Sequence, residues 1–126
     1  MGAALHIVLE KEIPGVDTII DGKMLSRAEK HLAGAAKRLG VRPLMEFFSV
    51  NPEEAAGFLE SEGVEVEIPA EQWFSAEEGL RTVQALLGEA DSSSESRAAK
   101  DDLLGCERVL REAQKREVRW HLAIDF

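Results

Sequence analysis

The stretch VRWHLAIDF at positions 118–126 alternates large apolar side chains with smaller or more polar ones. Successive side chains of a strand point to opposite faces, so this alternation predicts a strand with one apolar face. An exposed edge strand of this composition would promote aggregation, so we expect it to pair inside a sheet. Residues 5–10 show the same alternation and are a candidate neighbour. Both ends of the chain are therefore expected in the sheet.

A further strand is predicted at 64–68, where Val64, Val66 and Ile68 alternate with two glutamates. The segment 43–50 does not alternate cleanly and is consistent with either a buried strand or an irregular core segment. We therefore expect an α+β fold: a single small domain with a mixed or antiparallel sheet of about three to four strands and about four helices packed on it.

The helices are predicted from apolar spacing and from their end signals. One spans 25–39 and ends at Gly40, a second follows Asn51-Pro52 and ends at Gly63, and a third begins at the capping box Ser75-x-x-Glu78 and continues to Ala90. A fourth covers 97–115. The Ser-rich stretch DSSSES at 91–96 is expected to be a mobile connector, although Ser92-x-x-Glu95 could also cap the next helix.

Size and composition place the chain in one soluble domain. It has 126 residues, of which 44% are hydrophobic, and no apolar run of the ~20 residues that a membrane-spanning helix needs. No secretory leader pattern is present at the start, and a single cysteine, Cys106, cannot form an internal disulfide. We expect a cytoplasmic protein over residues 1–126 with no membrane association and with Cys106 buried.

No catalytic or cofactor-binding motif is found. The three histidines, His6, His31 and His121, lack metal-ligand spacing, and no phosphate-binding loop or nucleophile motif occurs. We therefore predict no catalytic residue, no metal and no cofactor. An alternative is a small enzyme or ligand-binding protein that uses His6 and His121, which would meet if the two end strands pair.

The charge distribution is unusual. Ten of the 24 acidic residues lie between positions 43 and 80, and this window contains no Lys or Arg. The rest of the chain has 14 acids and 15 bases, so the window accounts for the whole net charge of −9. Such a field favours basic partners and disfavours nucleic acid.

The main hypothesis is a non-enzymatic interaction module that binds a basic protein partner, in the manner of small immunity or inhibitor proteins. Alternatively, the acids are a solvated face paired with cations from elsewhere in the fold, and the two aromatic residues are core side chains. A structural homo-oligomer, in which a homodimer forms through the aromatics or an open strand edge, is a further alternative. The candidate partner-binding residues are Glu60, Glu62, Glu65, Glu67, Glu71, Trp73 and Phe74.

Overall fold

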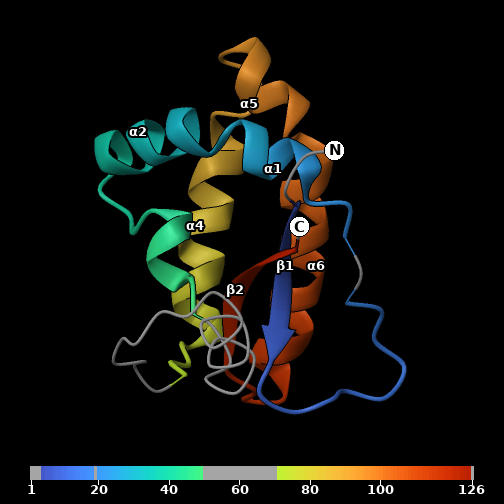
Figure 1. The fold of residues 1–126 in the computed structure, drawn as a ribbon. Helices are drawn as coiled ribbons and strands as arrows, with labels where there is room; N and C mark the ends of the chain where they lie inside the picture. The colour runs from blue at the N-terminus through green and yellow to red at the C-terminus, as the bar shows by residue number, and fades with distance from the viewer. Residues whose placement is uncertain (1–3, 19, 50–70, 126) are drawn as a thin grey trace, which may run out of the picture.

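The computed structural model describes residues 4–18, 20–49 and 71–125 of the chain (Figure 1). Within them it forms a small α+β fold of one domain. The elements, in chain order, are β1 (Ala4–Leu9), α1 (Lys23–Arg27), α2 (Glu29–Leu39), the short 3-10 helix η1 (Leu44–Phe47), α4 (Ala76–Gly88), α5 (Ser94–Ala98), α6 (Lys100–Lys115) and β2 (Trp120–Asp125).

The two ends of the chain pair with each other. β1 and β2 run antiparallel, with Leu5 opposite Ile124 and Leu9 opposite Trp120. The expected pairing of the terminal strand with the first strand is thus confirmed. The apolar face of this sheet forms one core with the buried faces of the helices.

The sheet has fewer strands than expected. In the described part of the chain it contains only β1 and β2, while single bridges join Phe48 and Phe74 to the other edge of β2. The segment 43–50 is not a continuous strand, because η1 occupies residues 44–47. The candidate strand at 64–68 and the candidate helix after Asn51 lie outside the described residues.

Helices α4 and α6 match the expected apolar stripes. The hydroxyl of Ser75 accepts a hydrogen bond from the Glu78 amide, so the predicted cap of α4 is confirmed. The buried residues of α4 include Ala76, Leu80 and Val83, and those of α6 include Leu103, Cys106, Val109, Leu110 and Ala113. In both helices, the apolar residues spaced three and four positions apart in the sequence form the face that packs against the core.

Two helices expected to be continuous are each divided. The helix expected at 25–39 becomes α1 and α2, which meet at Ala28, where φ is −91° and ψ is 3°. The helix expected at 97–115 begins at Lys100, and α5 precedes it, starting in the second half of the connector at 91–96 and ending at Ala98. The side chain of Ser93, rather than that of Ser92, caps α5 by accepting from the Ser96 amide.

The start of α1 is stabilised by a residue far along the chain. Gly22, the residue before α1, provides no side chain to cap it. Instead, the buried carboxylate of Asp102 in α6 accepts hydrogen bonds from the amides of Met24 and Leu25, at 3.1 and 3.3 Å. These two bonds satisfy free donors of the first turn and fix α1 against α6.

Candidate functional site: the outer face of the sheet

The face of the sheet that points away from the core carries both histidines of the two strands. The register places His6 opposite Ala123 and His121 opposite Val8, so the histidines are diagonal neighbours, with Cα atoms roughly 7–8 Å apart. We expected His6 and His121 to share one face of the sheet if the end strands pair. The strands do pair, and the two histidines do share that face. No group of three His, Cys, Asp or Glu side chains in the described residues is arranged to hold a metal ion.

A third extended segment, residues 71–74, continues this face beyond β2. Phe74 and Trp120 bond to each other through both backbone amides, at 2.8 and 2.9 Å, in an antiparallel bridge. This bridge places Trp73 opposite His121, and their rings lie 4.7 Å apart between centroids. Because side chains alternate along an extended chain, Glu71 and Trp73 share the outer face with His121.

His121 is the most enclosed polar residue of this face, with 2% of its surface exposed. Its Nε2 atom lies 2.7 Å from Oε2 of Glu71, and its Nδ1 atom lies 3.0 Å from the Leu122 carbonyl oxygen. Both ring nitrogens therefore have partners within the protein. A general base needs a free nitrogen within reach of a substrate proton, so the arrangement does not favour His121 as a catalytic base.

The segment 50–70, which contains six of the chain's glutamates, starts and ends beside this cluster. The hydroxyl of Ser49 accepts from the Gln72 amide at 2.8 Å, and the Ser49 amide donates to the Leu122 carbonyl at 3.0 Å. Residues 49 and 72 are therefore joined directly to each other and to β2. The acidic segment leaves and re-enters the described fold at one place.

The predicted site residues fall into three groups. Glu71 and Trp73 lie together on the outer face, around His121. Phe74 instead packs edge-on against Phe47, with ring centroids 5.3 Å apart, as the core-aromatic interpretation expected. Glu60, Glu62, Glu65 and Glu67 lie outside the described residues.

Acidic residues of the 43–80 window that the structure describes have cationic neighbours. Arg42 lies 3.7 Å from Glu46 and 3.3 Å from Glu78, and Arg81 lies 4.0 Å from Glu77. Glu46 and Glu77 thus pair with residues four positions away in the chain, whereas Glu78 and Glu71, which faces His121, have partners from distant parts of the chain. The described residues hold 18 acids and 15 bases, a balance of −3, and the segment 50–70 contributes the other six negative charges.

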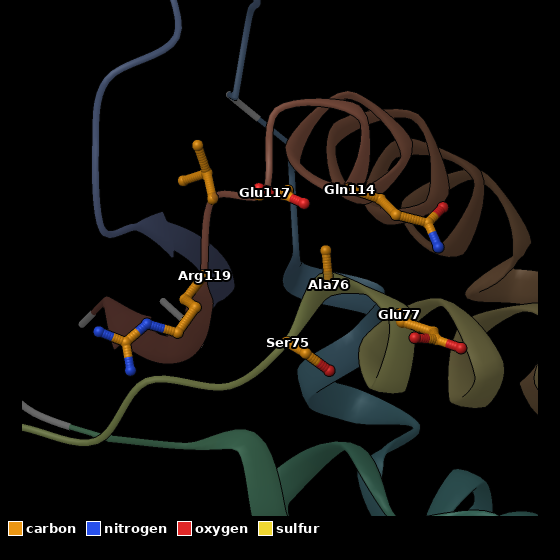
Figure 2. Close-up of a pocket in the computed structure, with 7 residues that line it drawn as sticks. Ser75, Ala76, Glu77, Gln114, Glu117 and Arg119 are labelled. Atoms are coloured by element: carbon orange, nitrogen blue, oxygen red, sulfur yellow. The ribbon is translucent and has the colours of Figure 1, made fainter.

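A cleft of about 380 Å³ opens at the other end of the helices, where α4 begins and α6 ends (Figure 2). Glu77 and Gln114 lie on one side of it and Arg119 on the other. Arg119 is ion-paired with Glu10, and Glu117 takes a left-handed φ of 56° as α6 ends. Sequence reasoning missed this cleft because its walls come from segments about 40 residues apart. It contains no nucleophile paired with a base.

The sequence also gave no signal for the contact between His31 and Ser93. Their Nε2 and Oγ atoms lie 2.9 Å apart, and the same oxygen accepts from the Ser96 amide. The hydroxyl therefore has a partner on each side and connects α2 to α5. Ser93 therefore caps the start of α5, and the contact with the His31 ring holds its hydroxyl in place, so the pair has a structural role.

The free edge of β1 is where a second copy would add a strand. The chain leaves β1 at Glu10 and returns to its start at Gly22, whose carbonyl accepts from the Leu5 amide at 3.1 Å (Figure 1). Near Leu5 this edge is therefore already bonded within the chain. The geometry does not favour a homo-oligomer formed by strand addition at that point.

Cys106 lies in the core, as expected, with 1% of its surface exposed. Burial raises the pKa of its thiol from 9.0 to about 12, and the nearby Asp102 carboxylate adds to the rise. Since the folded-state pKa exceeds that of the unfolded chain, the stabilisation is complete below about pH 9 and is lost as the pH rises to about 12.

We therefore expect the free energy of unfolding to fall by about 1 kcal/mol more between about pH 8 and about pH 10 in the unmodified protein than in Cys106→Ala. Urea unfolding at the two pH values measures this difference. The chain has no tyrosine, so no phenol ionises in the same range. If both proteins lost the same free energy of unfolding between the two pH values, the raised pKa of the Cys106 thiol would be contradicted.

Comparison of the chain with protein-family models, with curated proteins and with solved structures finds no match. Among the described residues, no helix is both long enough and apolar enough to cross a bilayer. Any statement of function therefore rests on the residues themselves.

Proposed function

We propose that this protein is a non-enzymatic interaction module that binds a basic protein partner through the segment 50–70 and the adjoining residues Glu71 and Trp73. The observation that carries the proposal is the location of the excess charge. Three of the four described acids of the window, Glu46, Glu77 and Glu78, have an Arg side chain within 4.0 Å, whereas the segment 50–70 supplies six glutamates and no Lys or Arg. A surface of one sign accelerates encounters with an oppositely charged partner and selects against others.

Trp73 supplies apolar contact area next to this charge. Its ring is half-buried and packs on His121, so it is oriented before any partner arrives. A tryptophan held in one orientation loses little conformational entropy on binding, and aromatic residues of this kind often dominate binding energy. The glutamates would then set the association rate and the salt dependence of binding. Trp73 would slow the dissociation of the complex.

The location of the charge is tested by two variants of equal net charge. The first replaces Glu60, Glu62, Glu65 and Glu67 by Gln. The second replaces exposed acids outside the segment, as Glu12→Gln, Asp21→Asn, Asp101→Asn and Glu117→Gln. Each variant changes the net charge from −9 to −5. The probe is an oligolysine peptide of about ten residues, titrated at about 50 mM and about 500 mM salt.

We expect the unmodified protein to bind the peptide at low salt and to lose affinity at high salt. The first variant should lose at least about tenfold in affinity at low salt, and the control variant less than about threefold. Equal losses in both variants would show that only net charge matters. That result would contradict a binding site in this segment, as would binding that does not depend on salt.

A further inference from the structure

The backbone of β1 has one side that β2 does not cover. The Glu10 amide donates to the carbonyl of Arg119, the residue before β2, at 2.9 Å. Backbone groups of successive residues in a strand point to alternate sides, and the register of β1 with β2 is unbroken. Leu5, five residues before Glu10, therefore points away from β2, and its amide donates to the Gly22 carbonyl there. The odd-numbered residues of β1 share this direction.

Ile7 and Leu9 continue the same edge without a partner. In the part of the chain that the structure describes, no group bonds to their amides or carbonyls on this side. Each residue presents one donor and one acceptor, so four backbone groups follow one another along the edge. The other edge of the sheet differs, because Phe74 and Ser49 bond to the outward groups of β2. An unpaired edge is a template for an added strand.

The loop 10–22 brings negative charge to this edge. It leaves the far end of β1 and returns to the start of the edge through Gly22 (Figure 1). The loop holds four of the 18 described acids and one of the 15 described bases, which leaves 14 of each in the rest of the described fold. Its Ile13, Val16 and Ile20 side chains pack against the core. The excess charge of the described fold therefore lies beside the open edge and favours a cationic strand.

We propose that an extended, basic segment of the partner adds to β1 as a third strand, bonded to Ile7 and Leu9. The inference rests on the proposed function, because it names the way in which the basic partner docks. Residues of the added strand opposite Ile7 and Leu9 place apolar side chains on the core face, and those opposite Val8 and Glu10 place Lys or Arg on the outer face. Main-chain bonds supply the affinity, and the alternating side chains supply the specificity. A second copy of this chain fits less well, since each copy has a net charge of −9.

Hydrogen exchange of the free protein tests whether the edge is open. We expect the amides of Ile7 and Leu9 to exchange at least about tenfold faster than the amide of Val8, which faces β2, after correction for the intrinsic rate of each residue. Slow exchange of Ile7 and Leu9 in the free protein would overturn the proposal. The edge would then be closed, either by the loop 10–22 or by a second copy.

A short peptide with capped ends, Lys-Val-Lys-Val-Lys, tests the added strand at about 50 mM salt. At saturation we expect the Ile7 and Leu9 amides to become protected at least about tenfold, while the Val8 amide, already bonded within the sheet, changes little. Absence of binding, or binding that leaves Ile7 and Leu9 unprotected, would overturn strand addition. Equal protection by the acidic counterpart Glu-Val-Glu-Val-Glu would overturn the choice of a basic strand.

Two N-methylated forms of the peptide separate backbone bonds from side-chain contacts. In the bound strand the valine amides face β1 and the lysine amides face away, because neighbouring residues alternate. Methylation of the two valine amides therefore removes two donors to β1, whereas methylation of two lysine amides removes none, at the same charge. We expect at least about a tenfold loss of affinity in the first peptide and less than about threefold in the second. Equal affinities would contradict bonding to the edge.

Strand addition and the proposed function can fail separately. The variant with four glutamines in the segment 50–70 tests what attracts the basic partner, and the Ile7 and Leu9 amides test how the partner docks. If oligolysine binding depends on the segment but the Lys-Val peptide leaves both amides unprotected, strand addition is wrong and the proposed function stands. If the peptide protects both amides but the glutamine variant binds oligolysine normally, strand addition stands and the role of the segment is wrong.

Discussion

Replacing Trp120 by alanine is expected to lower the free energy of unfolding by about 3–5 kcal/mol, the range typical of removing a large buried aromatic side chain. Trp120 has no exposed surface. Its ring stacks on Phe47 with centroids 5.0 Å apart, and its Nε1 donates to the Ser75 carbonyl at 3.0 Å. The variant would leave a cavity and remove one of the two hydrogen bonds that the Ser75 carbonyl accepts, the other coming from the Gly79 amide at 3.3 Å.

Gly79 shows how closely this site is filled. A Cβ atom at that position of α4 would lie 2.4–2.8 Å from atoms of the Trp120 ring. The helix therefore approaches β2 directly over the indole, and Gly79 has no side chain to fill the space that the ring leaves. The larger the cavity that remains, the closer the loss lies to the upper end of the range.

Trp73→Ala is the matched control, because it removes the same type of side chain from the segment bridged to β2, on the outer face that is turned away from the core. Trp73 is half-buried and lies outside the core cluster, so we expect a loss of about 1 kcal/mol. Urea unfolding of both variants measures the difference. Losses of similar size would mean that the outer face contributes as much to stability as the core, contrary to the burial pattern.

The sequence was sufficient to predict features that depend on local periodicity. The faces of β1 and β2, the buried stripes of α4 and α6 and the Ser75 cap all follow from spacing at two, three or four residues. The number of strands was predicted less well. A single-residue bridge such as that of Phe48 with Leu122 leaves no alternating pattern, and η1 replaces the expected regular segment.

The contacts that define the candidate site join residues far apart in the chain. Glu71 is 50 positions from His121, and Asp102 is 78 positions from Met24. A glutamate that pairs with a histidine and one that faces solvent look alike in a sequence. The acidic window could therefore be recognised from composition alone, whereas the pairing of Glu78 with Arg42, 36 positions away, required coordinates.

Gly22→Ala is expected to lower the free energy of unfolding by roughly 2–4 kcal/mol, of which about 1 kcal/mol comes from its left-handed backbone. Gly22 has φ of 72°, and a Cβ atom there would lie 1.8 Å from the Leu5 carbonyl oxygen and under 3.0 Å from two further backbone atoms of Leu5. Leu5 cannot move away easily, because β1 is paired with β2 along its length.

Gly40→Ala separates the two causes. Gly40 ends α2 with a nearly identical φ of 74°, but nothing lies within 4 Å of its Cβ position. This variant should therefore lose only the backbone contribution of about 1 kcal/mol. The excess loss in Gly22→Ala, measured by urea unfolding, reports how tightly the turn before α1 is packed on β1. If the two variants lost equal stability, the turn would be free to move away from the strand, and the bond from Leu5 to the Gly22 carbonyl would not fix the edge of the sheet.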